Sequence, residues 1–338
     1  MNAFVESVPF WIIVVIKSAI VLLVVITTFA YAMLFERKVM GWMQLRPGPN
    51  RVGPWGMLQP AADAVKMMFK EDLTPNTADP LIYRLAPFIS LITAMGAFAI
   101  IPFSVSADGT PWSIGNVNAG ILFVFALTSI GVYGISLAGW ASGSKFPLLG
   151  SVRATAQMIS YELSMSMSVI GVLILAGSTA LADIVSAQAR LWFAVPQIVG
   201  FTIYLITAVA ETNRAPFDLV EAETELVGGF HTEYSGLRFG LFFIAEYLNM
   251  ITVSCLATLL FLGGWNGLFG LPSVGIAGLV WFLLKATLFL FFYIWLRTTL
   301  PRFRYDRLMD FGWKVLLPVA TLNLVVTAVI VALVPGHA

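Results

Sequence analysis

Eight stretches of this sequence are each long enough and apolar enough to cross a lipid bilayer as a helix. A hydrocarbon core about 30 Å thick requires about 20 helical residues that rise about 1.5 Å each. The runs cover residues 10–35, 82–104, 117–140, 154–178, 191–210, 239–263, 275–297 and 312–334. Their residues do not alternate as the strands of a β-barrel do. We therefore expect an all-α polytopic membrane protein in which residues 1–338 form a single integral membrane domain with eight transmembrane helices.

The distribution of positive charge orients this predicted bundle. All of the 19 Lys and Arg residues except Lys17, Arg190 and Lys285 lie in or beside the connections 36–81, 141–153, 211–238 and 298–311. Short connections that stay in the cytoplasm are the ones that retain positive charge. We therefore expect these four connections to be cytoplasmic and both termini to lie outside the cytoplasm, as an even number of spans also requires.

The chain offers little with which to bind a cofactor or a nucleic acid. Cys255 is the single cysteine, so the chain can form neither an intrachain disulfide nor a multi-cysteine metal site. The sequence has no glycine-rich fingerprint for the phosphates of NAD or flavin. A net charge of +1 argues against nucleic acid as a partner. We expect no metal and no redox cofactor on this chain itself.

The connection from residue 36 to residue 81 is long and has the composition of an ordered loop. It opens with Glu36, Arg37 and Lys38 and continues as QLRPGPNRVGPWG over residues 44–56. Its prolines fix φ and its glycines permit tight turns. We expect a compact loop that presents Arg46 and Arg51.

Residues 57–70 then follow a helical period. Apolar residues form one face, and Gln59, Asp63 and Lys66 recur on the other. A helix of about 21 Å is too short to span a bilayer. We expect an amphipathic helix that lies along the membrane surface, either as a simple interfacial anchor or as one wall of a functional pocket.

The 211–238 connection is an acidic loop. Its four carboxylates within eight residues are Asp218, Glu221, Glu223 and Glu225. Like charges this close cannot all ionise at their ordinary pKa values, so the segment is a candidate proton reservoir. The alternative is an ordinary solvated acidic face. We expect a helix that starts between Asn213 and Pro216 and ends at Gly228, with Asp218, Glu221 and Glu225 on one side.

Three further acids lie in or at the ends of predicted spans. They are Glu162 in the fourth span, Glu211 at the end of the fifth and Glu246 in the sixth. An ionised acid inside a helix that crosses the bilayer costs about 2.5 to 3.5 kcal/mol on insertion scales. We expect these acids to form a titratable chain from the acidic loop into the bilayer, unless each is an isolated, satisfied ion pair. Lys17 and Lys285 are also intramembrane, as relay members or counter-ions whose partners the sequence does not identify.

Three segments together resemble the H subunit of the respiratory NADH:quinone oxidoreductase, complex I, which is its quinone-chamber membrane subunit. They are ERKVMGWMQLRPGPNRVGP (residues 36–54), GMLQPAADAVKMMFKED (56–72) and PFDLVEAETELVGGF (216–230). The resemblance covers essentially the whole chain, in matching order. It implies a subunit of a proton-pumping translocase in a bacterial inner membrane, with the mitochondrial inner membrane as the less favoured location.

The resemblance also implies roles for particular residues. Quinone would be the substrate, and its tail would enter between the first and sixth spans and the surface helix. The residues implied for quinone binding are Arg37, Arg46, Phe217, Asp218, Arg297 and Arg302. Those implied for proton coupling are Glu162, Glu211, Arg214, Asp218, Glu221, Glu223, Glu225 and Glu246. The iron-sulfur clusters and FMN would belong to hydrophilic partner subunits of the same complex, beside further membrane subunits.

Three other functions are compatible with a bundle of this kind. A secondary proton or ion transporter would use Glu162 and Glu246 as carrier sites, but we find neither repeat symmetry nor matched interrupted helices in the sequence. A passive membrane anchor leaves the buried acids unexplained. The homologous membrane subunit of an energy-converting hydrogenase is the nearest alternative, and the complete loop at residues 36–54 favours quinone.

Overall fold

The computed structural model describes residues 10–219, 226–267 and 274–333, which are helical almost throughout. Apart from one isolated bridge between Val105 and Pro111, the described residues contain no β structure. The longer helices are α2 (Phe10–Met43), α3 (Gln59–Phe69), α4 (Pro80–Ala97), α5 (Gly120–Ala141), α6 (Lys145–Ala176), α8 (Ile198–Glu211), α10 (Gly236–Phe261), α11 (Ile276–Thr299) and α13 (Leu317–Leu333). Shorter elements are η1 (Pro54–Gly56), α7 (Leu181–Ala187), η2 (Gly229–His231), α12 (Tyr305–Phe311) and the π-helical turn η4 (Gly312–Leu316), which joins α12 to α13.

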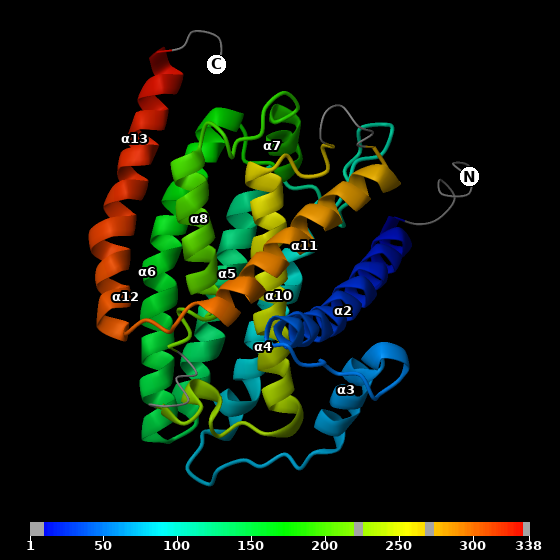
Figure 1. Cartoon of the computed structure of the whole chain (residues 1–338), viewed down its shortest axis with the longest axis vertical. Coiled ribbons are helices and arrows are strands. Elements are labelled where there is room, and N and C mark those ends of the chain that lie inside the picture. Colours follow the sequence, from blue (N-terminus) through cyan, green and yellow to red (C-terminus); the bar gives the residue numbers. More distant parts are fainter. Residues whose placement is uncertain (1–9, 220–225, 268–273, 334–338) are drawn as a thin grey trace.

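The helices form an upright bundle crossed by two oblique helices (Figure 1). α4, α5, α6, α8 and α10 stand side by side, and α13 covers the outer side of α6 and α8. α2 and α11 run obliquely across this bundle, and both contact α10. The first turn of α2 and the last turn of α13 lie toward the same end of the molecule, and α3 lies at the other end.

The prediction of an all-α polytopic membrane protein is confirmed. Seven of the described helices are long and apolar enough to cross a membrane. The predicted span at residues 191–210 is shorter than expected, because its helical part is only α8, with 14 residues. At about 1.5 Å per residue α8 extends about 21 Å, less than a bilayer core. The structure therefore supports seven spans by length and leaves the eighth to α8 and the segment before it.

Gln188 makes that non-helical segment possible. Irregular backbone at membrane depth requires partners inside the protein. The buried Gln188 side chain donates to the carbonyls of Ile184 and Leu259, at 3.2 and 2.8 Å. Its oxygen accepts from the backbone N–H groups of Phe193 and Gly263, at 3.2 and 3.0 Å. One side chain thus satisfies the backbone both after α7 and at the end of α10.

The C-terminal end of α2 lies later in the chain than the sequence predicts. The sequence predicts that Glu36, Arg37 and Lys38 open a loop, but α2 continues to Met43. The apolar run ends at residue 35, whereas the helix continues for about two more turns. Glu36 therefore lies on a helix that packs against α10 and α11.

The surface helix exists, as α3, but packs the opposite way to its expected polarity. Asp63, from the polar face, is buried against α2, while Val65, Met68 and Phe69 are exposed. The reason is an ion pair between Asp63 and α2, described below. The apolar side of α3 is therefore free to meet lipid or a partner.

Close approach of helices depends on small residues, as is common in membrane bundles. At Gly134 in α5, a Cβ atom would lie 2.0 Å from the Ser90 hydroxyl of α4. At Gly139, it would lie 2.2 Å from the Ser151 hydroxyl of α6. α5 thus sits tightly between its two neighbours.

We predict that Gln188→Leu destabilises the protein, because four backbone groups lose their partner in a buried site. An unsatisfied buried polar group costs about 1–3 kcal/mol. The melting temperature of the purified protein in detergent should fall by several degrees. The control variant Gln44→Leu, at an exposed position, should leave the melting temperature unchanged. Equal melting temperatures for the two variants would show that Gln188 does not support this segment.

Candidate functional site

A buried ionic network joins three helices in the half of the bundle nearer to α3. We call this half the inner half and the opposite one the outer half. Arg214, in the segment after α8, donates through Nη1 to both carboxylate oxygens of Glu36, at 3.1 and 3.3 Å. Its Nε lies 2.6 Å from Oε1 of Glu246 on α10. Arg297, near the end of α11, donates to Glu36 as well. Two arginines and two carboxylates thus link α2, α10 and α11 through the segment after α8.

The network survives burial because its charges are matched. Glu36 and Arg214 are only 1% and 5% exposed. Burial lowers the pKa of the Arg214 guanidinium, but Glu246 and Glu36 outweigh this effect and hold it above its ordinary value. The guanidinium also lies over the ring of Tyr247, 4.3 Å from its centroid. Arg214 is therefore a permanent cation whose two acidic partners respond to each other through it.

A second ion pair fixes α3 to α2. Arg37 Nη1 donates to Asp63 at 2.7 Å, Gln59 donates at 3.1 Å, and Lys66 lies 3.6 Å away. Burial raises the pKa of Asp63, but the hydrogen bonds from Arg37 and Gln59, with the nearby positive charges, lower it below its ordinary value of 3.8. Arg37 therefore holds α3 against α2, one residue after Glu36 of the ionic network.

The acidic loop is only partly described. Glu221, Glu223 and Glu225 lie outside the described residues, so the predicted common face of Asp218, Glu221 and Glu225 is untested. The predicted helix start at Asn213–Pro216 is wrong. Asn213 has a φ of +52°, in the left-handed region, and residues 212–219 form turns. Asp218 is non-helical, and Arg302 donates to it at 2.9 Å.

Phe217 is held between aromatic rings and a buried amide. Its ring lies 5.7 Å from that of Phe303 and 6.0 Å from that of Tyr161, between centroids. The buried Gln157 side chain donates to the carbonyls of Phe217 and Ala210, at 3.0 and 2.8 Å. The polar face of α6 therefore holds the segment after α8, a role that its sequence left open.

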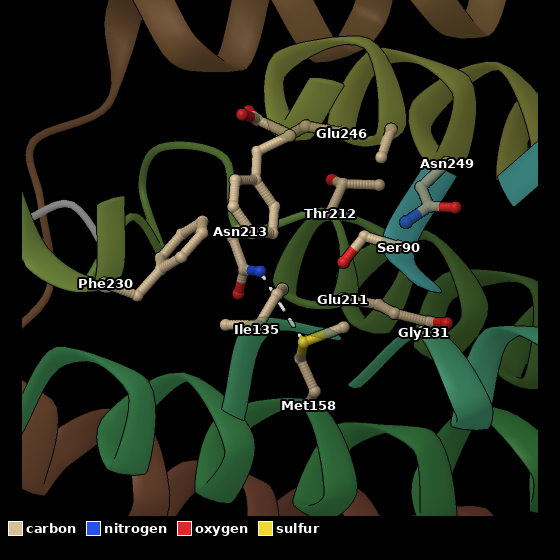
Figure 2. Close-up of a pocket in the computed structure, with 12 residues that line it drawn as sticks. Ser90, Gly131, Ile135, Met158, Glu211, Thr212, Asn213, Phe230, Glu246 and Asn249 are labelled. Carbon is tan, nitrogen blue, oxygen red and sulfur yellow. Dashed lines mark hydrogen bonds between the residues drawn. The ribbon is translucent and has the colours of Figure 1, made fainter. Parts of the chain in front are cut away.

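An acid-lined cavity lies directly behind the network (Figure 2). It measures ≈ 40 Å³ and is lined by Glu211, Glu246, Asn249, Ser90 and Met158, among others. A buried water needs about 10–15 Å³, so the cavity can hold about three water molecules. In Figure 2 the carboxylates of Glu211 and Glu246 point to different sides of this cavity. Water in it would connect the ionic network with Glu211.

Glu162 continues the line of acids into the bilayer. It accepts a hydrogen bond from Ser129 of α5, and it interacts electrostatically with Glu211. Glu211 is 7% exposed, and its Oε2 has no hydrogen-bond partner among the described residues. Glu246 of α10 and Glu211 of α8 thus line one cavity, and Glu162 of α6 interacts electrostatically with Glu211.

Two of the residues discussed from sequence are not part of this cluster. Arg46 is exposed and donates to the side chain of Gln44 at 2.8 Å. Lys285 is buried, and its ammonium donates to the carbonyls of Leu262, Gly264 and Asn266 at 2.7, 2.9 and 2.7 Å. Lys285 therefore satisfies backbone carbonyls just after the end of α10, and its role as a relay member or counter-ion stays a prediction.

Sequence reasoning misses one central residue. It places Glu36 at the start of a basic loop, whereas the structure shows that Glu36 accepts from both Arg214 and Arg297. A signal exists, since an acid directly after a long apolar run occupies a place where only a cation is expected. Its partners, 178 and 261 residues away along the chain, cannot be found from the sequence.

These features define a polytopic membrane protein that carries a buried charge network and a line of intramembrane acids. The NADH dehydrogenase family model matches residues 16–328. The chain belongs to this family.

Curated relatives agree over nearly the full length. An NADH-quinone oxidoreductase H subunit of Symbiobacterium thermophilum is 52% identical, covering 95% of this chain and 97% of the relative. The H subunit of the Deinococcus deserti enzyme is 53% identical, covering 94% and 83%. That of Brevibacillus brevis is 48% identical, covering 98% of both chains. The resemblance stated from the sequence is confirmed.

We predict that Arg214→Leu strongly destabilises the bundle, because Glu36 and Glu246 then repel each other without their shared cation. Removing one partner from a buried ion pair typically costs about 3–5 kcal/mol. Unfolding of the purified protein by heat or by denaturing detergent measures the loss. The matched control is Arg304→Leu, whose pair with Asp306 is 80% and 71% exposed and contributes almost nothing. Similar losses in both variants would contradict the role of the network.

The ion pair of Asp63 predicts a dependence on pH. Its folded pKa lies below 3.8, so its contribution is present above about pH 4 and is lost as the pH falls through the folded value. At pH 7 we expect Asp63→Asn to loosen α3 and speed proteolysis of the 44–58 segment, as acid does in the unsubstituted protein. Asp310→Asn, on the exposed surface, is the control. The attachment would be refuted if Asp63→Asn left cleavage rates unchanged.

Proposed function

We propose that this chain is the quinone-chamber membrane subunit of a bacterial proton-pumping NADH-quinone oxidoreductase. The names of its relatives support the enzyme, and the buried network of Glu36, Arg214, Arg297 and Glu246 beside the acid-lined cavity supports the role in it. In this proposal the chain is one subunit of an enzyme and lies in the bacterial inner membrane. Both termini lie outside the cytoplasm, and α3 lies at the cytoplasmic surface.

Quinone chemistry gives these residues complementary tasks. A long apolar substrate requires an opening to lipid, and the exposed apolar side of α3 beside the inner ends of α2 and α10 is such a surface. Reduction of a quinone to a quinol takes up two protons with two electrons. In the proposal Arg37, Arg297 and Arg302, with Phe217, line the path of the headgroup. Asp218, an ionised carboxylate in its pair with Arg302, takes up a proton from the acidic loop and passes it to the reduced quinone. Arg46 is proposed at the outer part of the opening.

The proton taken from the chamber must be linked to the membrane. When Asp218 passes on its proton, its carboxylate is ionised again beside Arg302. In the proposal this change of charge acts on Arg297 and Arg214. Those two cations share Glu36, and Arg214 also pairs with Glu246 at the cavity. A change of charge near the quinone thus alters the balance at Glu246, Glu211 and Glu162. Glu221, Glu223 and Glu225 are proposed as the reservoir that refills Asp218.

Electrons must reach the quinone from other chains. We propose that hydrophilic partner subunits hold the iron-sulfur clusters and FMN and dock beside the acidic loop and α3. Further membrane subunits would receive the charge signal from Glu162. The energy-converting hydrogenase and the secondary transporter are less favoured, since the relatives are named for quinone.

The test separates catalysis from coupling in the intact complex. We predict that Asp218→Asn lowers NADH:quinone reductase activity roughly tenfold, a barrier increase of about 1.4 kcal/mol, because proton delivery is slowed. Reduction of a hydrophilic artificial acceptor by the same membranes should be unchanged, and so should complex content. Glu211→Gln should reduce proton pumping per quinone reduced, and the exposed Asp306→Asn should match the unsubstituted enzyme. Normal quinone turnover in Asp218→Asn membranes would overturn this role.

A further inference from the structure

A large cavity opens on the outer half of the bundle, remote from the site described above. It measures ≈ 800 Å³ and shares no lining residue with the acid-lined cavity. Its walls come from α2, α10, α11 and the outer segment between α4 and α5. Most of the wall is apolar and includes Val25, Cys255, Phe282 and Ala286. The volume lies within the range of about 300–1,000 Å³ that ligand sites occupy.

The cavity is most polar at one end, since the other polar side chains in its lining, Thr28 and Thr287, bond to carbonyls of their own helices. Lys17 lines it near the outer end of α2, together with Ser106, Thr110 and Ser113 of the outer segment. Trp112 donates to the Ser106 hydroxyl at 2.6 Å, and tryptophans mark the level of the membrane interface. A lysine one or two turns inside a helix end reaches this level by extending its side chain. The polar end of the cavity thus lies where lipid headgroups lie.

Lys17 is an exposed cation that makes no hydrogen bond or ion pair with any of the described residues. This sets it apart from Lys285, whose ammonium is satisfied by three carbonyls. A ligand that fills the apolar cavity would lie against this cation, and an anionic group there would gain a charge-assisted contact that a neutral group would not. Charge complementarity therefore favours a ligand with a negative group at its polar end.

The cavity is about as long, measured along its helices, as one leaflet of a bilayer is thick. Along α2 its lining runs from Lys17 to Thr28, and along α11 from Leu279 to Leu290. A helical stretch of this length, at about 1.5 Å per residue, extends about 16 Å. Half of a hydrocarbon core about 30 Å thick is about 15 Å. A ligand with its charged end at Lys17 would therefore extend along α2 and α11 toward the middle of the membrane.

We propose that this cavity binds one anionic phospholipid of the outer leaflet, with its phosphate on Lys17 and its acyl chains between α2 and the α10–α11 pair. An ammonium–phosphate contact is a charge-assisted hydrogen bond, among the stronger contacts available here. A quinone tail would fill the apolar part but leave Lys17 without an anion. A helix from a partner protein would bury Lys17 and would need an acid of its own at that point. The lipid holds α2 against α11 at their outer ends.

The experiment measures lipid that stays bound to the purified complex. The complex is exchanged into detergent, supplied with equal phosphatidylglycerol and phosphatidylcholine, washed, and analysed by native mass spectrometry. We expect one phosphatidylglycerol per complex to depend on this site. Lys17→Gln should lower its retention at least about tenfold, which corresponds to about 1.4 kcal/mol, while Lys17→Arg should retain it. Equal retention by Lys17→Gln would overturn the proposal.

A second pair of variants tests the cavity itself. Val25→Trp fills it, whereas Leu23→Trp adds the same side chain to the exposed lipid side of α2, outside the lining. Only Val25→Trp should lose the lipid. A phosphatidylglycerol with a photoreactive acyl chain should cross-link to the α10 segment around Cys255 in the unsubstituted complex. The proposal fails if quinone is extracted from the site instead, if cross-links reach only other subunits, or if phosphatidylcholine binds equally well.

Discussion

The inner half of this protein depends on the shared guanidinium of Arg214. It lies between Glu36 of α2 and Glu246 of α10, and Glu36 is in turn bridged to Arg297 of α11. In a low-dielectric interior each of these charges would be costly alone, and together they are tolerated. This single arrangement explains why α2 and α11 cross the bundle obliquely and still meet α10 at their inner ends. It also pairs the carboxylates of Glu36 and Glu246 with an arginine of the segment after α8.

The outer half is held together by different means. Neutral and positive side chains satisfy backbone groups that the helices leave open: Gln188 serves four of them and Lys285 serves three carbonyls. Small residues let α4, α5 and α6 approach closely. The two halves therefore differ in character. The inner half keeps mutually responsive charges, and the outer half keeps fixed hydrogen bonds.

Much of the fold is predictable because the bilayer imposes length and polarity on each helix. The predicted spans that correspond to α4, α5, α6, α10 and α11 lie within a few turns of the observed helices. The prediction is wrong where these constraints end: α2 continues beyond residue 35, and the run at 191–210 is helical only from residue 198. In both places the backbone is governed by specific partners. A hydropathy pattern carries no information about those partners.

The site is predictable by residue type more than by arrangement. Glu162, Glu211 and Glu246 stand out as acids in apolar surroundings, and the structure brings Glu211 and Glu246 to one cavity, with Glu162 in electrostatic contact with Glu211. The importance of Glu36 and the burial of Asp63 escape sequence reasoning, since both follow from contacts with distant residues. The partners of Lys285 are likewise not visible in the sequence. An intramembrane charge suggests a relay, and the partners of this one are three backbone carbonyls.

α10 connects the ionic network of the inner half to the hydrogen bonds of the outer half. Gln188 and Lys285 bond backbone groups in and just after its final turn, and Glu246 lies 15 residues before its last residue, about 22 Å away. α10 is one unbroken helix over this distance, so it connects the ionic network at Glu246 directly to the hydrogen bonds at its far end.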